Sequence, residues 1–356
     1  MNHLPSELED VIIDFCHEDR TTLASCGLVC RGWLPASRFH LFSSITLTAE
    51  NTPGFLDIIS HTQTIKPLVQ DVELRFSGAS VLYLQVVPIL LLLTRTTQLS
   101  LRPARDEVTR PVCTSSLSRA LAAPSLVHLK FDFKSRFESL QQVIDCACLC
   151  PQLESLEVGG SWMRTGYFAV PPRLPRTLHT LILTCDLDNF LTWFLALENQ
   201  MPPIQHLSLQ HIVRREVPTV IKYLETAGPG LKSLSLAFRD TDAADQLAKE
   251  VDLSQSINLQ YFHLEGSAAG IFLCLLTLLP QLRRCGIEQI TVTIRGQNQP
   301  DMIRTYPWYT LDCGLSLMKR LTLLVVEPLT HVQRRDIAEG ILGQLPLTRT
   351  LGIVTF

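Results

Sequence analysis

The sequence carries little charge and shows no clustering of basic residues. Charged residues make up 18% of its 356 positions, and the formal net charge is -3. The Lys and Arg residues are scattered, so the chain lacks the electrostatic footprint of proteins that bind nucleic acids. Hydrophobic residues make up 46%, which is enough to bury a large core and excludes a disordered chain. We therefore expect a folded protein without a nucleic-acid partner.

The sequence also lacks a hydrophobic run long enough to cross a membrane. Its densest apolar stretch spans only Val81 to Leu93 and contains Pro88, whereas a membrane helix needs about 20 apolar residues. We interpret the stretch as a buried helix. Near the N-terminus, acidic residues from Glu7 to Asp14 occupy positions where a signal peptide would need apolar ones. The sequence thus predicts a cytoplasmic and/or nuclear protein with no membrane partner.

Cysteine is present without a pattern that would give it a role. The eleven cysteines form an odd number without a repeating interval, so disulfides are not expected in a reducing compartment. Cys146, Cys148 and Cys150 form the densest cluster, but no second Cys or His pair follows at the spacing of a structural zinc site. Packing within a helix is favoured over a metal site, and we expect neither metal nor cofactor.

Motifs of the common catalytic and nucleotide-binding sites are also missing. The chain contains no GxGxxG or P-loop sequence to cradle phosphates, and no GxSxG, HExxH or kinase set. No Ser or Cys nucleophile has His and Asp in a recognisable context. We therefore expect a protein that is not an enzyme and has no catalytic residue.

The N-terminal segment, in contrast, has a clear helical pattern. Ser6 followed by Glu9 is a capping-box pattern and predicts the start of a helix. Leu8, Ile12 and Phe15 recur at helical spacing with acidic residues on the other face, which predicts an amphipathic helix of about ten residues.

Two more short helices are predicted over Thr21 to Leu28 and over Cys30 to Leu41. Pro35 lies inside the second of these, where it should kink or divide the helix. Three helices of this length build a very small core. A module of about 40 residues is marginal alone, and it usually needs a partner or a docked neighbour to be stable.

The spacing of apolar residues in this segment resembles the F-box, the helical module by which substrate receptors attach to cullin-type ubiquitin ligases. The matching residues are Leu4, Pro5, Leu8, Ile12, Leu23, Val29, Cys30, Arg31 and Trp33. The match covers Leu4 to about Phe42, within a helical module of residues 1–42, and is closest to the F-box proteins abundant in basidiomycete (mushroom-type) fungi. It implies docking onto the Skp adaptor, with Leu4, Pro5, Leu8, Ile12, Leu23, Val29, Cys30 and Trp33 as adaptor-binding residues. The alternative is a helical cap on a larger fold.

From residue 43 onward, a second pattern of apolar residues repeats along the chain. Its central residues are Ile45, Val72, Leu99, Leu129, Leu156, Leu181, Leu207, Leu234, Phe262, Ile290, Leu321 and Leu351. The intervals lie between 25 and 31 residues, and the pattern resembles the strand of leucine-rich repeats. Side chains alternate along a strand, so every second residue should face the core. Because the first repeat follows the helical module without a linker, we expect the two to be rigidly joined.

Helices are predicted between these strands. Their expected ranges are Phe137 to Leu149, Asn189 to Glu198, Val217 to Ala227, Ala243 to Val251, Gly270 to Leu279 and Val332 to Leu345. Several should end at Pro or Gly, as at Leu279-Pro280. The sequence thus predicts an α/β fold in which residues 43–356 form a leucine-rich-repeat-like horseshoe solenoid with a parallel sheet and about 11–12 repeats.

The repeats depart from the regular family pattern in one respect. Leucine-rich repeats commonly place Asn or Cys three residues after the last strand leucine, and these residues are absent here, so we expect irregular repeats. The alternative is an ordinary doubly wound α/β domain with evenly spaced strands. Such a domain should vary more in strand spacing, and a nucleotide-binding one should have a Gly-rich first turn.

Residues that should line the concave sheet face are mostly small or uncharged and carry hydrogen-bonding groups. The candidates for target binding are His206, Ser208, Gln210, Ser233, Ser235, Tyr261, His263 and Glu265. Such a surface suits a protein partner better than a polyanion.

The F-box resemblance implies a substrate-recognition subunit of an SCF-type (Skp-cullin-F-box) E3 ubiquitin ligase. The helical module would bind the Skp adaptor and through it a cullin, while the solenoid would bind an unknown protein substrate. Catalysis would then result from proximity alone. Two alternatives remain open: a non-catalytic repeat scaffold or sensor without a ligase role, and an F-box protein that binds the adaptor outside a ligase.

Overall fold

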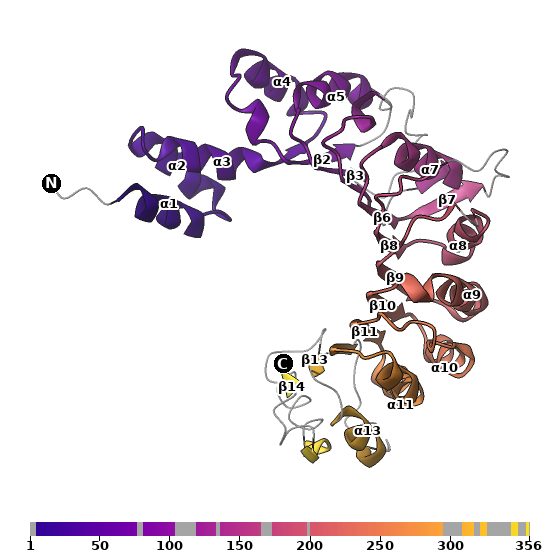
Figure 1. The fold of residues 1–356 in the computed structure, drawn as a ribbon. Coiled ribbons are helices and arrows are strands. Elements are labelled where there is room, and N and C mark those ends of the chain that lie inside the picture. Colours follow the sequence, from indigo (N-terminus) through magenta and orange to yellow (C-terminus); the bar gives the residue numbers. More distant parts are fainter. Residues whose placement is uncertain are drawn as a thin grey trace. The chain divides into compact units, whose positions relative to one another are not determined.

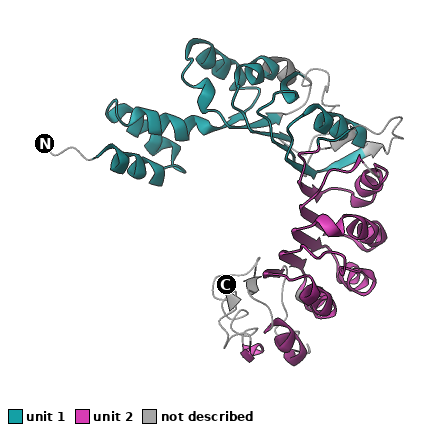
Figure 2. Cartoon of the chain, in the orientation of Figure 1, with its two compact units in different colours: residues 1–175 teal, residues 176–356 magenta. Residues whose placement is uncertain are grey.

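The computed structural model divides the chain into two compact units, Met1–Pro175 and Arg176–Phe356 (Figure 2). The structure describes residues 5–76, 81–103, 119–132, 136–164, 173–197, 200–294, 308–316, 321–325, 343–347 and 354–355.

Three helices open the first unit, as the sequence predicts. They are α1 (Ser6–Phe15), α2 (Arg20–Val29) and α3 (Leu34–Ser43), and both α1 and α2 pack on α3. At the start of α2, the Asp19 carboxylate accepts hydrogen bonds of 3.0 Å from the backbone N–H groups of Thr21 and Thr22. This side chain therefore satisfies two of the donors that a helix N-terminus leaves unpaired.

Two details of this module differ from the sequence-based prediction. Helix α1 begins at Ser6 with Pro5 as its N-cap and has no side-chain cap, so the predicted capping box with Glu9 is wrong. Pro35 does not kink a helix, because α3 begins only at Leu34 and Pro35 lies in its first turn. A proline is well tolerated there, since its missing N–H would have had no partner within the helix.

The repeats of the first unit place their strands in one parallel sheet (Figure 1). Its strands are β1 (Ser44–Leu47), β2 (Asp71–Phe76), β3 (Gln98–Pro103), β4 (His128–Phe131) and β6 (Ser155–Gly159). The connecting segments contain α4 (Thr52–His61), η1 (Lys66–Leu68), α5 (Val81–Leu92) and α7 (Leu140–Leu149). The register pairs the predicted central residues with one another, from Ile45 through Val72, Leu99 and Leu129 to Leu156.

The second unit continues the same strand and helix alternation. Its parallel strands are β8 (Thr180–Thr184), β9 (His206–Ile212), β10 (Ser233–Phe238), β11 (Tyr261–Gly266), β12 (Gln289–Ile294), β13 (Leu321–Val325) and β14 (Val354–Thr355). The helical elements are α8 (Leu187–Leu195), η3 (Arg214–Glu216), α9 (Val217–Ala227), η4 (Gly228–Gly230), α10 (Thr241–Glu250), α11 (Ala268–Arg284) and α13 (Trp308–Leu315).

In the second unit, the strand register also pairs the predicted central residues with one another, with one exception. Leu181, Leu207, Leu234, Phe262, Ile290 and Leu321 are aligned from strand to strand. The partner of Leu321 in the last strand is Val354, so the predicted final central residue, Leu351, is wrong by three positions.

The core of the second unit lies between the sheet and its helices. Alternate strand residues such as Leu181 and Leu183 are fully buried, as strand geometry requires. Figure 1 shows α9, α10 and α11 along one side of the strands, and no helix of the described residues covers the other face of β9, β10 and β11. We call this helix-free side the open face. Phe190, Phe194 and Tyr223 pack ring against ring between α8 and α9, with centroids 5.7 to 6.0 Å apart.

Two of the predicted helices need correction. Arg136–Ser139 forms strand β5, which pairs in parallel with β7 (Ser161–Arg164), so the helix predicted from Phe137 starts only at Leu140. Helix α11 does not stop at Pro280 but runs on to Arg284. Burial of the apolar residues on both sides of this proline outweighs the backbone hydrogen bond that it removes. Most of the helix predicted over Val332 to Leu345 lies outside the described residues.

These strands and helices form an α/β leucine-rich-repeat-like fold with a parallel sheet and N-terminal helices. Helix α5 confirms the interpretation of the Val81 to Leu93 stretch, and Val86, Ile89 and Leu93 are buried in it or just after it. None of the helices within the described ranges is both long and apolar enough to cross a membrane.

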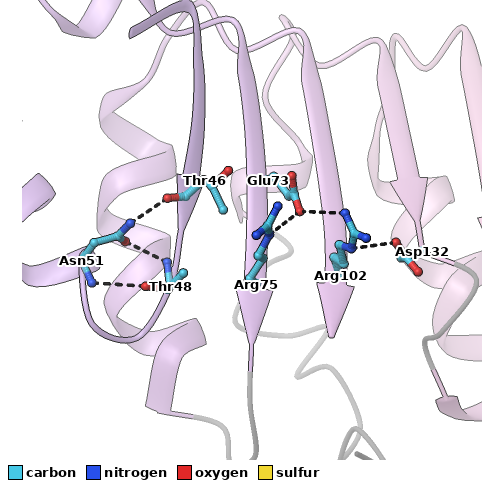
Figure 3. Close-up of polar contacts among 7 residues, drawn as sticks. All are labelled: Thr46, Thr48, Asn51, Glu73, Arg75, Arg102 and Asp132. Carbon is cyan, nitrogen blue, oxygen red and sulfur yellow. Dashed lines mark hydrogen bonds and ion pairs between the residues drawn. The ribbon is translucent and has the colours of Figure 1, made fainter. Parts of the chain in front are cut away.

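In the first repeat, another residue takes the place of the Asn or Cys that leucine-rich repeats commonly have after the strand. The Asn51 amide donates to the Thr46 carbonyl at 2.8 Å and accepts from the Thr48 N–H at 2.8 Å (Figure 3). Asn51 thus closes the turn after β1, one position later than the expected Asn or Cys. In the second unit, Asn258 reaches back one repeat and donates to the Pro229 carbonyl at 2.8 Å.

Candidate functional site

The three N-terminal helices have a small core of their own. Ile13 and Leu23 are fully buried, and Cys26 is nearly so. Gly27 on α2 faces Ser37 on α3, and a Cβ added to the glycine would lie 3.6 Å from the Ser37 Cβ. Small residues at this crossing let the two helices approach closely.

Most apolar side chains of α1 lie outside this core. Leu8, Val11, Ile12 and Phe15 follow one another at helical spacing and are exposed, Phe15 to 85%. At 100° per residue this stripe points away from Ile13, which is the buried residue of α1. On α2, the neighbouring residues Leu28 and Val29 are exposed as well, Leu28 to 88%. We call Leu8, Val11, Ile12, Phe15, Leu28 and Val29 the apolar patch.

The structure separates the predicted adaptor-binding residues into three groups. Pro5, Leu8, Ile12, Val29 and Cys30 are exposed, and Trp33 is half-buried. Leu23 is a core residue with no exposed surface, so it supports the module from within and is not available to a partner. Leu4 lies outside the described residues.

Phe15 and Leu28 are the most exposed members of the apolar patch, yet neither is among the predicted adaptor-binding residues. The spacing of Phe15 with Leu8 and Ile12 could have identified it from the sequence. Leu28 lies five residues after the buried Leu23, about 140° further around α2, so helical spacing already places the two leucines on different faces.

Polar contacts hold the module together and attach it to the first repeat. His40 Nε2 on α3 lies 2.7 Å from Asp14 Oδ1 on α1. Arg20 on α2 donates from Nη2 to the Ser44 carbonyl of β1 at 2.8 Å. Helix α3 ends at Ser43 and β1 begins at Ser44, so no linker separates the module from the first repeat. The apolar patch is therefore carried on a module that is attached directly to the sheet of the first unit.

On the open face of the second unit, the predicted target-binding residues lie on adjacent strands. Ser235 Oγ and His263 Nδ1 lie 2.8 Å apart, and His263 Nε2 and Thr293 Oγ1 also lie 2.8 Å apart. Thr293, which the prediction had not included, thus completes a row across β10, β11 and β12. Glu265 was expected on the exposed face, but only 6% of it is accessible.

The other members of this face are uncharged and carry hydrogen-bonding groups. The Gln210 amide donates to Ser208 Oγ at 3.0 Å, and Tyr261 is exposed. Burial lowers the pKa of His206, and the nearby His179 and Lys232 lower it further. His206 is therefore neutral at physiological pH, in keeping with an uncharged surface.

The strand face of the first unit that carries Glu73, Arg75 and Arg102 is different, because it presents a row of charged residues that the predicted target-binding set does not include. Glu73 on β2 contacts Arg75 at 2.7 Å and Arg102 on β3 at 3.5 Å, and Arg102 contacts Asp132 at 3.1 Å (Figure 3). Burial raises the pKa of Glu73, but the hydrogen bonds and charges of the two arginines outweigh it and lower the pKa overall. Glu73 is thus an anion throughout the physiological range.

The cysteines of the densest cluster contribute to the packing of the fold. Cys146 and Cys150 are buried, and burial raises the pKa of Cys146, Cys148 and Cys150 to about 12. Their thiols are therefore protonated and unreactive near neutral pH. Within the parts of the chain that the structure describes, no three His, Cys, Asp or Glu residues are grouped to hold a metal ion.

No family model and no curated protein matches the sequence. Among solved structures, the chain is similar to the leucine-rich repeat-containing protein LegL7 from Legionella pneumophila. The two share 12% sequence identity with a TM-score of 0.47, over 84% of this chain and 98% of that one. At this identity the similarity says nothing about function.

Proposed function

We propose that this protein is the substrate-recognition subunit of an SCF-type E3 ubiquitin ligase. In this proposal the apolar patch binds the Skp adaptor, the adaptor connects the protein to a cullin, and the solenoid holds a target protein. The chain itself would break or form no bond, because ubiquitin transfer would follow from the target being held close to a ubiquitin-conjugating enzyme.

The observation that supports this proposal most strongly is the apolar patch. A soluble protein gains stability by burying side chains such as Phe15 and Leu28, yet α1 and α2 leave both of them almost fully exposed. Several exposed apolar residues along one helix face, as on α1, are typical of a surface that docks another protein. Three members of the patch, Leu8, Ile12 and Val29, are also among the residues that resemble the F-box pattern.

The proposal is tested by removing the apolar patch and measuring adaptor affinity. The triple substitution Leu8→Ser, Ile12→Ser and Phe15→Ser replaces side chains that are outside the core, so we expect the fold to persist. Binding to an immobilised Skp adaptor, followed by biolayer interferometry, should weaken by about 100-fold or more because buried apolar anchors dominate such interfaces.

A matched control removes exposed apolar side chains elsewhere in the same unit. Ile58 on α4 and Leu91 on α5 are exposed to 44% and 42%, close to Ile12 at 42%. The variant Ile58→Ser with Leu91→Ser should bind the adaptor as the unsubstituted protein does. Equal affinity of the triple variant and the control variant would contradict the proposal and favour a repeat scaffold without a ligase role.

A second readout separates a ligase subunit from an F-box protein that acts outside a ligase. The purified chain is mixed with the Skp adaptor and a cullin, and the three proteins are analysed by size-exclusion chromatography. A ligase subunit gives a ternary complex. An assembly that holds the adaptor but excludes the cullin would contradict the ligase role and support the other alternative.

For the target, the open face of the second unit is the proposed contact surface. It carries uncharged hydrogen-bonding and aromatic groups, including the exposed His206 and Tyr261 and the half-buried Ser235. Such groups recognise the backbone and polar side chains of a protein partner without requiring a strongly charged ligand.

A further inference from the structure

Three cations lie on consecutive strands of the first unit. They are Arg75 on β2, Arg102 on β3 and Lys130 on β4. Arg75 and Arg102 are register partners, so their strands are about 4.8 Å apart at this point. Lys130 pairs with Ser100, two residues before Arg102, and is therefore a diagonal neighbour of Arg102. We call Arg75, Arg102 and Lys130 the cation row.

Each cation is held by a carboxylate of the same sheet face. Arg75 Nε donates to Glu73 at 2.7 Å, while Arg102 uses Nε for Asp132 at 3.1 Å and Nη1 for Glu73 at 3.5 Å (Figure 3). Lys130 Nζ lies 2.8 Å from a Glu157 oxygen on β6. These ion pairs therefore hold the three cations in defined positions despite their mutual repulsion.

The carboxylates and the cations are not equally accessible. The side chains of Arg75, Arg102 and Lys130 are 45%, 44% and 43% exposed. Their partners Glu73, Asp132 and Glu157 are 26%, 9% and 30% exposed. Although the formal charges balance, a molecule that approaches this face meets the cations first.

The two arginines also retain hydrogen-bonding capacity toward solvent. A guanidinium carries five N–H donors in a planar fork. Among the described residues, Arg75 uses only its Nε in an ion pair, and Arg102 uses Nε and Nη1. The remaining Nη groups are suited to a bidentate contact with a carboxylate.

Stabilisation of the fold alone is a weak explanation of this arrangement. Ion pairs between accessible side chains contribute about 0 to 1 kcal/mol, and like charges on directly opposite strand positions are unfavourable. A sheet face that only needed to be soluble would not require Arg opposite Arg. Holding cations by more deeply placed carboxylates instead preorganises them, which reduces the entropy lost when a ligand binds.

We propose that the cation row binds a short acidic segment, rich in Asp or Glu, of a protein partner. Carboxylates of the segment contact the Nη groups of Arg75 and Arg102, and Lys130 contributes a further positive charge. The proposal rests on the proposed protein-binding role of the solenoid and names the partner class that the first unit recognises. It does not depend on adaptor binding.

The test uses the purified full chain and a fluorescein-labelled hexaglutamate peptide, followed by fluorescence polarisation at about 50 mM and 300 mM salt. The unsubstituted protein binds hexaglutamate, binds hexaglutamine not at all, and loses affinity at the higher salt concentration because the contact is electrostatic. The double variant Arg75→Gln with Arg102→Gln loses about tenfold or more in affinity, as expected for the removal of charge-assisted hydrogen bonds.

A charge-matched variant shows whether the loss is local. Arg95 and Arg119 are exposed arginines of the same unit outside the cation row, and Arg95→Gln with Arg119→Gln removes the same charge. This control keeps its affinity within about twofold. Thermal melting of both glutamine variants checks that they are folded. A further variant, Arg75→Lys with Arg102→Lys, keeps the positive charge but loses the planar guanidinium, and it binds with intermediate affinity.

Three results would overturn the inference. They are failure of the unsubstituted protein to bind hexaglutamate, equal affinity loss in the two glutamine variants, and equally tight binding of a single-stranded DNA oligonucleotide of the same charge. The last result would indicate unselective attraction of anions. Adaptor affinity measured on the same samples is independent of these outcomes, so failure of this inference and failure of the ligase proposal can be told apart.

Discussion

Glu216 is a carboxylate that the fold buries to 3% exposure and surrounds with backbone donors. Its Oε1 accepts from the Leu187 N–H and its Oε2 from the Val213 N–H, both at 3.2 Å. Leu187 is the first residue of α8, so the carboxylate satisfies a donor that a helix N-terminus would leave unpaired. Glu216 thus connects two successive repeats of the second unit.

The pKa of Glu216 predicts a specific dependence of stability on pH. Burial raises this pKa above its ordinary value of 4.5, and the two backbone hydrogen bonds oppose the rise only in part. Between the unfolded and the folded pKa, the folded state binds more protons, so this group's contribution to stability falls as pH rises through that window. The variant Glu216→Gln cannot titrate at this position.

We therefore expect the difference in unfolding free energy between the unsubstituted protein and Glu216→Gln to decrease as pH rises from about 4 towards neutrality. Urea denaturation at several pH values measures it, and subtraction removes the contribution of all other groups. A difference that is constant or rises with pH would show that Glu216 is not destabilised as an anion.

At the same scale, the sequence could identify the residues of the N-terminal module but not the direction in which each points. Leu23 and Leu28 are both leucines of α2, yet one is fully buried and the other is 88% exposed. The two residues lie five positions apart, so they point about 140° apart around the helix. Helical spacing separates them, but which of the two faces is buried depends on the packing of α2 against α3, and the sequence alone does not give it.

Strands were the elements that the sequence predicted best. Alternation of apolar residues placed the central residue of each repeat correctly from Ile45 to Leu321, because the parallel register aligns these residues directly. Helix limits were predicted less well. The strand formed by Arg136–Ser139 depends on pairing with β7, a nonlocal contact that a helical pattern in the sequence does not reveal.

The alternation within one strand can be tested on two neighbouring residues of β11. Phe262 is 1% exposed and Tyr261 is 45% exposed. We expect Phe262→Ala to lower the free energy of unfolding by about 3–5 kcal/mol, because it removes buried apolar surface and leaves a cavity. Tyr261→Ala should change it by less than about 1 kcal/mol.

Urea denaturation of both variants makes this comparison, since the two substitutions remove rings of similar size from adjacent positions. Similar destabilisation by the two variants would mean that the strand does not present its faces as the structure shows. The result would then also remove Tyr261 from the proposed target-binding surface.

At the scale of the whole molecule, the helical module that we propose to bind the adaptor is joined to the repeats that we propose to bind a target. The sequence already predicted that the module and the first repeat are directly joined, and α3 does run into β1 without a linker. The cation row of the first unit was harder to foresee. It depends on which residues become register partners and on how deeply their carboxylates are placed, and neither property is visible in a linear sequence.

Binding of the Skp adaptor by the apolar patch is tested by the mass of the complex in solution. The purified chain, with a mass of 40.0 kDa, is mixed with the adaptor and analysed by size-exclusion chromatography with light scattering. We expect a single species with the combined mass of one chain and one adaptor. Separate elution of the two proteins at concentrations of about 10 μM, where an interface of this kind should be occupied, would contradict it.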